Sequence, residues 1–120
     1  MKIEEAILIH RTWKTRVGDY IYNPDKSLRP EECHERSCAL TKWMASEAAH
    51  ELLDERELYE LQKAHKAFHH TLSEIIMNAN RGVEISEEIA LGVDSLFNRH
   101  HEAVLRILQK IKAKKEKVAA

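Results

Sequence analysis

Glycine, proline and long apolar runs are scarce in this chain, which has only 3 Gly and 2 Pro in 120 residues. An all-β fold needs many turns built from those two residue types, so their scarcity argues against one. No apolar stretch is long enough to cross a bilayer. Acidic residues at Glu4 and Glu5 interrupt the N-terminal run where a signal peptide would need continuous apolar residues. We therefore expect no membrane insertion and a cytoplasmic location.

An excess of charge of one sign is also lacking, because the formal net charge is -1. A near-neutral balance provides no global field that would attract nucleic acid, so no nucleic-acid partner is expected. The basic stretch at about 110–120 is interpreted as a solvated helix end. A length of 120 residues predicts a single domain over 1–120 that can bury a core without disulfides.

Cysteine is scarce as well, whereas histidine is abundant: the chain has 2 Cys and 8 His. In a reducing compartment, Cys33 and Cys38 are more plausible as a ligand or a reactive thiol than as a disulfide. On a continuous helix Cys33 would point well away from Cys38, and its role stays open. The excess of histidine is the feature that needs an explanation.

The apolar residues recur every three or four positions almost everywhere, which is the helical period. Helices are predicted over 3–20, 30–49, 58–79 and 89–111, and both prolines fall in a loop over 23–32. The second helix is the shorter one, and its predicted seam is made of mostly small residues: Cys38, Thr41, Ala45, Ala48 and Leu52. The fold class is therefore all-α, as an antiparallel four-helix bundle with one shorter helix, whose core would hold whatever site the histidines form.

Histidines lie on three of the predicted apolar seams, at His10, His65 and His100. A buried imidazole costs free energy unless it is paired or bound, and each one alone is readily explained as a hydrogen-bonded core residue. His65 and His69 are four residues apart, which places both rings on one face of a helix. With the soft thiolate of Cys38, three imidazoles would complete a tetrahedral zinc site, and the thiolate argues against magnesium or calcium.

Three blocks of the sequence resemble the signature of the chemoreceptor zinc-binding domain family. They are His10-Arg-Thr-Trp13, Cys38-Ala-Leu-Thr-Lys-Trp43 and His65-Lys-Ala-Phe-His69, in the family's order. The resemblance implies that His10, Cys38, His65 and His69 bind Zn²⁺, and that Trp13 and Trp43 pack around the site. Thr41 replaces the family's glycine in the second block, and its hydroxyl could bond to the helix or to a ligand. His100 is expected to support the site from the last helix or to lie in the core.

The resemblance also implies a cytosolic sensor rather than an enzyme. Members of the family are usually attached to chemoreceptors or diguanylate cyclases and are often homodimers, so this chain is expected to be a stand-alone version. Four protein ligands leave no open position for hydrolysis. Cys38 would be the most easily oxidised ligand, which suggests a switch that responds to zinc or to hypochlorous acid.

Two other functions remain open from the sequence. A hemerythrin-like di-iron bundle also uses a histidine-rich helical core, but it needs bridging carboxylates and a final HxxxxD pattern. Arg106 stands five residues after His101, where that aspartate would be required. The other alternative is a metal-free helical interaction protein.

Overall fold

The computed structural model describes residues 1–119, with side chains as far as residue 117. Its elements are α1 (Ile3–Tyr22), the short 3-10 helices η1 (Pro30–Cys33) and η2 (Glu35–Ser37), α2 (Ala39–Met44), α3 (Glu47–Leu52), α4 (Glu55–Asn80), α5 (Glu87–Leu91) and α6 (Leu96–Ala119). The described residues contain no strand. The all-α fold class is confirmed. Residue 120, the last position of the predicted basic helix end, lies outside the described residues.

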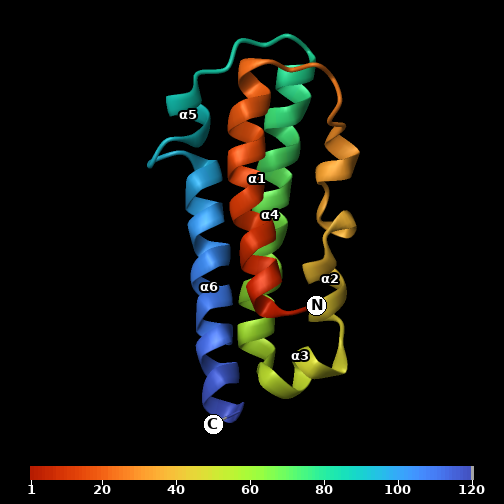
Figure 1. Ribbon diagram of the computed structural model, residues 1–120, viewed down its shortest axis with the longest axis vertical. Helices are drawn as coiled ribbons and strands as arrows, with labels where there is room; N and C mark the ends of the chain where they lie inside the picture. Colours follow the sequence, from red (N-terminus) through yellow and green to blue (C-terminus); the bar gives the residue numbers. More distant parts are fainter. Residues whose placement is uncertain (120) are drawn as a thin grey trace.

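Three long helices, α1, α4 and α6, run side by side, and the segment from η1 to α3 forms the fourth side of the bundle (Figure 1). Helix α1 and helix α4 run in the same direction, whereas α6 and the η1–α3 segment return in the opposite one. The result is an up-down-up-down arrangement. Helix α4 contacts α1, α6 and every element from η1 to α3, so it lies at the centre of the packing.

Helix α4 has clear start and stop signals in the sequence. The Asp54 carboxylate accepts the backbone N–H of Glu57, and the Glu57 side chain accepts the backbone N–H of Asp54, which forms a complete capping box. After Asn80 the chain turns through Gly82, whose φ of 78° lies in the left-handed region that favours glycine. Between these ends a buried apolar stripe runs along the helix and carries two histidines: Leu58, Leu61, His65, Phe68, His69, Leu72, Ile76 and Ala79.

The single second helix predicted over 30–49 is wrong. The backbone is extended at His34, Cys38 and Ser46, and each of these residues stands at the start of a separate short helix. The ring of His34 and the hydroxyl of Ser46 accept backbone N–H groups of the turns that follow, which stabilises the interruptions. The predicted seam changes accordingly: Ala45 and Ala48 are exposed, whereas Leu40, Met44, Ala49 and Leu53 are buried with Cys38.

The last predicted helix, over 89–111, is divided in two. Helix α5 ends at Gly92, where a Cβ atom would lie 2.2 Å from the Glu88 carbonyl oxygen, so only glycine fits this close approach. The Ser95 hydroxyl then accepts the backbone N–H of Asn98 at the start of α6. Ile89 and Val93 follow the apolar period of the predicted helix, but they are 81% and 83% exposed. The buried face of α6 consists of Phe97, His101, Val104, Leu105, Leu108 and Ile111.

Candidate metal centre

Helix α1 contributes His10, which is fully buried and has one defined tautomer. Its Nδ1 donates a hydrogen bond to the Ala6 carbonyl oxygen at 2.7 Å, one turn earlier in the helix. The lone pair of Nε2 is therefore left for another partner. That nitrogen lies 3.8 Å from the sulfur of Cys38. Burial lowers the pKa of His10, so the ring is neutral near pH 7.

Helix α4 contributes His65 and His69, whose ring centroids are 4.5 Å apart. His69 Nδ1 donates to the Cys33 carbonyl oxygen at 2.8 Å, which fixes its ring and leaves Nε2 without a hydrogen-bond partner. Neither ring nitrogen of His65 has a partner among the described residues, although the side chain is fully buried. Unsatisfied buried nitrogens are costly, so three of them in one place indicate a missing ligand.

Burial also sets the protonation of this pair. Desolvation, together with the neighbouring imidazoles of His69 and His10, lowers the pKa of His65 to about 3. Desolvation lowers the pKa of His69 to about 4, partly offset by its bond to the Cys33 carbonyl. Both rings are therefore neutral at pH 7, which is the form that binds a metal ion.

Cys38 comes from the extended residue between η2 and α2, not from the interior of a helix. Its side chain is buried, and burial raises the pKa of the thiol above its ordinary value. Without a cation nearby the sulfur therefore carries its proton at neutral pH. A bound metal ion would displace that proton and hold the sulfur as thiolate.

The geometry of the four side chains fits a zinc ion. One ligand atom from each of His10, Cys38, His65 and His69 lies within 4.8 Å of all the others. A tetrahedral zinc ion with ordinary Zn–N and Zn–S bond lengths requires ligand atoms about 3.3 to 3.6 Å apart. The separations between the four atoms therefore need to shrink by at most about 1.2 to 1.5 Å around an ion. Their nitrogen and sulfur chemistry is that of zinc, not of calcium or magnesium.

The donor set does not fit a di-iron centre. No Asp or Glu joins the cluster in the part of the chain that the structure describes. A hemerythrin-like site requires carboxylates that bridge two metal ions. The cluster also lies beside Phe68, whose ring contacts His10 and His69 with centroids 5.4 and 5.1 Å apart. An apolar neighbour of this kind limits water around the ligand atoms.

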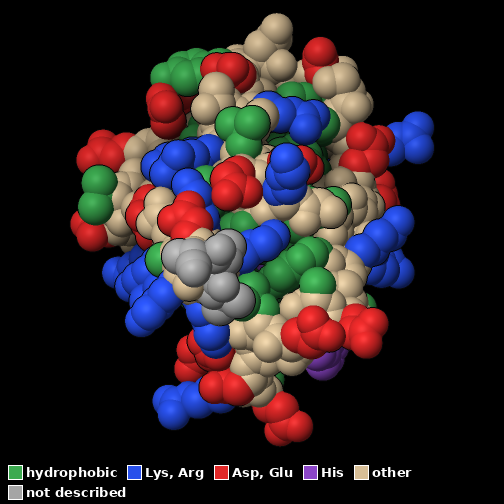
Figure 2. Space-filling model, turned by 60° about the horizontal axis from the view of Figure 1, so that its bottom comes forward, with side chains coloured by type: hydrophobic (Ala, Val, Ile, Leu, Met, Phe, Trp, Pro, Cys, Tyr) green, Lys and Arg blue, Asp and Glu red, His purple; other side chains and the backbone are tan. Residues whose placement is uncertain are grey.

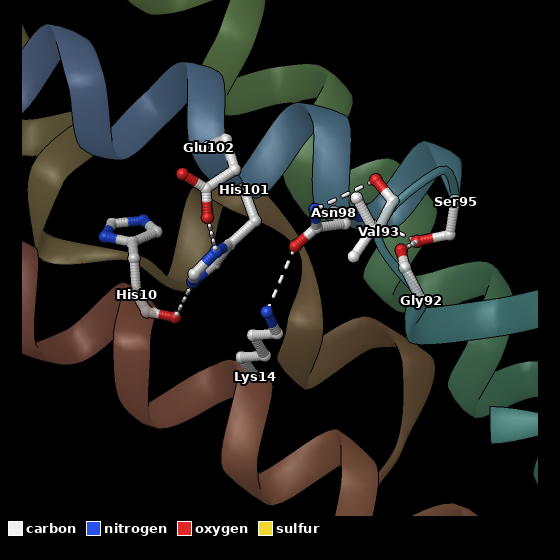
Figure 3. A network of polar contacts seen from close by, with 8 residues as sticks. All are labelled: His10, Lys14, Gly92, Val93, Ser95, Asn98, His101 and Glu102. Carbon is white, nitrogen blue, oxygen red and sulfur yellow. Dashed lines mark hydrogen bonds and ion pairs between the residues drawn. The ribbon is translucent and has the colours of Figure 1, made fainter. Parts of the chain in front are cut away.

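The histidine of α6 that reaches the site is His101, not His100. His101 is 3% exposed, and its Nε2 donates to the His10 carbonyl oxygen at 3.1 Å (Figure 3). His100 is only half-buried and has no place in the cluster. The prediction for His100 is wrong because the period counted from Ile89 assumes one continuous helix. The break between α5 and α6 shifts the buried face of α6 by one residue. Phe97 four positions before and Val104 three positions after His101 were the signal that could have identified it.

The remaining predicted residues lie around the cluster. Trp13 and Trp43 are half-buried and pack against the hydrophobic core. The Thr41 hydroxyl donates to the Glu35 carbonyl oxygen at 2.6 Å, so it ties α2 back to η2 and does not contact a ligand. Cys33 is fully buried, and it is its backbone carbonyl that holds His69. No sequence pattern could have identified a contact made by a carbonyl group.

Comparison with known families agrees with this geometry. The pattern of the chemoreceptor zinc-binding domain matches residues 10–76, which is more than half of the 120 residues. The chain belongs to the chemoreceptor zinc-binding domain family. The matched region begins at His10 and contains all four residues of the cluster, and Zn²⁺ is the metal that fits both the family and the donor set. No curated protein and no solved structure matches the chain.

Outside the matched region, the last turns of α6 are rich in lysine. Lys112 and Lys114 lie near Glu116 and Glu57, at 4.0 and 3.0 Å. The end-on view shows Lys and Arg side chains interspersed with Asp and Glu over this face (Figure 2). Among the described residues, no helix combines the length and apolar character needed to cross a membrane.

Proposed function

We propose that this chemoreceptor zinc-binding domain holds one Zn²⁺ ion through His10 Nε2, Cys38 Sγ, His69 Nε2 and one ring nitrogen of His65. The observation that carries the proposal is the set of buried ring nitrogens without partners on His65 and His69, facing a buried thiol. Four protein ligands leave zinc no open position, which favours a structural or regulatory role over hydrolysis. A bound zinc ion would cross-link α1, α4 and the start of α2, so that metal binding would stabilise the folded state.

Metal analysis tests the ligand assignment. The purified protein should carry about one zinc per chain, and Cys38→Ser or His69→Ala should weaken binding sharply. Cys33→Ser is the matched control, because it removes the other buried thiol, which is absent from the cluster. Stoichiometric zinc that survives both ligand substitutions would refute the assignment.

We further propose that Cys38 makes the site responsive to oxidants such as hypochlorous acid. Oxygen transfer to its thiolate gives a sulfenic acid, and chloride leaves. A sulfenic acid is a poor zinc ligand, so the ion is released and the start of α2 is no longer held to α1 and α4. Because α2 is a short helix between two extended residues, it depends on this attachment more than a long helix would.

Hypochlorite titration tests the switch. Zinc should appear in solution, detected by a coloured chelator, in proportion to the oxygen added to Cys38, measured by mass spectrometry. The Cys33→Ser variant should respond in the same way. Full retention of zinc after Cys38 has been oxidised would leave the ion with a purely structural role.

A sensory domain needs a means of passing its signal on. We propose that residues 1–120 form one such domain, cytoplasmic, that acts as a homodimer or docks on a chemoreceptor or a diguanylate cyclase. Ile89, Val93 and Leu96 are exposed apolar side chains at the α5–α6 junction, which supports an interface there. Size-exclusion chromatography with light scattering, with and without zinc, measures whether the dimer forms.

A further inference from the structure

A small cavity of about 90 Å³ lies beside the proposed zinc site. It lies between η2 and α4 and is lined by His34, Glu35, Lys66, His69, His70 and Ser73. Its volume admits several water molecules. The inner member of the lining is His69, which is 2% exposed and whose Nε2 has no hydrogen-bond partner. The cavity therefore ends at one of the four proposed ligands.

Two imidazoles stand at the outer rim of this cavity, and they differ in the lone pair that each can offer. His70 Nε2 lies 2.9 Å from a carboxylate oxygen of Glu74, so it donates its proton there and leaves the Nδ1 lone pair free. A carboxylate on the far nitrogen increases the basicity of an imidazole towards a metal ion. His34 has no free lone pair to offer. Its Nδ1 accepts the backbone N–H of Arg36, and its Nε2 then carries the proton.

We propose that His70, supported by Glu74 and by the nearby carboxylate of Glu35, is the acquisition site where a divalent zinc ion is first captured before it passes to His69. The inference rests on the proposed zinc site. A hydrated ion cannot shed all its water at once into a buried pocket without a large cost. At the rim His70 Nδ1 would replace part of that water, and the ring of His69, one residue earlier in α4 and lining the same cavity, would replace more of it.

A charged side chain at the rim should also affect the rate of zinc uptake, and its removal should have the opposite effect to the removal of His70. Lys66 lines the same cavity, and its positive charge repels an approaching cation. Removing that charge should make zinc uptake faster, whereas removing the His70 imidazole should make it slower. A path through this cavity predicts both effects.

Stopped-flow kinetics on the full chain tests the path. Metal-free protein is mixed with Zn²⁺ to measure uptake, zinc-loaded protein is mixed with a coloured chelator to measure release, and competition titration gives the affinity. In H70Q, uptake and release should both slow by about tenfold, with the affinity unchanged, because a residue that acts only along the path changes both rates equally. In K66Q, uptake should accelerate by about threefold at low salt, and less at high salt.

The control is H34N, whose amide oxygen can still accept the Arg36 N–H while the imidazole is lost. Its rates should equal those of the unsubstituted protein. Unchanged rates in both H70Q and K66Q, or equal slowing in H34N and H70Q, would overturn the assignment of His70. Failure of the zinc site itself would be seen separately, as less than stoichiometric zinc at equilibrium in the unsubstituted protein, and it would overturn both proposals.

Discussion

Acid should destabilise the metal-free protein between pH 7.5 and 5, because in this range the unfolded chain protonates two imidazoles that stay neutral in the folded core. The pKa of His65 is about 3 and that of His69 about 4 in the folded protein, against 6.5 for an unperturbed ring. The unfolded chain therefore binds protons that the folded chain does not bind, and stability falls as the pH falls below about 6.5. The stability of the folded protein is unaffected by these two rings above about pH 6.5, and it falls progressively as the pH approaches 4 and 3.

The size of the effect follows from the two shifts. At pH 5 the pH is about 1.5 units below the pKa of an imidazole in the unfolded chain. Proton binding therefore stabilises the unfolded state by about 2 kcal/mol for each ring and about 4 kcal/mol for the pair. Domains of this size have a total stability of about 5 to 15 kcal/mol. The metal-free protein should therefore lose a large part of its stability over a range in which most carboxylates remain ionised.

Urea unfolding in the presence of a chelator, followed by circular dichroism at several pH values, measures this loss. His65→Leu is the informative variant, because leucine fills a similar volume and cannot bind a proton. Its unfolding free energy should fall by about 2 kcal/mol less than that of the unsubstituted protein over the same range. An unfolding free energy that stays constant from pH 7.5 to 5, or identical pH profiles for the two proteins, would refute the reasoning.

Two further predictions concern stability at neutral pH. His101→Leu removes the bond to the His10 carbonyl and should reduce the unfolding free energy by about 1 to 2 kcal/mol, whereas His100→Leu should change it by less than about 0.5 kcal/mol. Equal effects of the two substitutions in urea unfolding would contradict the placement of His101. Asp54→Ala removes the capping box of α4 and should cost about 1 kcal/mol in the same assay, against no measurable change for Glu51→Ala at an exposed position. A cost below about 0.3 kcal/mol would show that the cap does not stabilise α4.

The helical period identified the long helices well, because each of them buries one continuous stripe. In α4 the line from Leu58 to Ala79, the capping residues and Gly82 all act locally, so they are visible in the sequence. The period failed where several short helices follow one another. Over 30–49 the side-chain caps at His34 and Ser46 compete with helix continuation, and tertiary packing decides between the two.

The sequence by itself determined the donor chemistry. Two imidazoles four residues apart lie on one helix face, and three ordered blocks indicate the family, because residue type and spacing are local properties. Only the tertiary structure decided how those donors are supported. His101 rather than His100 holds the His10 carbonyl, the carbonyl of Cys33 orients His69, and one cavity is lined by both His69 and His70. These contacts join residues far apart in the chain, and the packing of α6 and of the η1–η2 segment against α1 and α4 fixes them, which no periodicity along the sequence specifies.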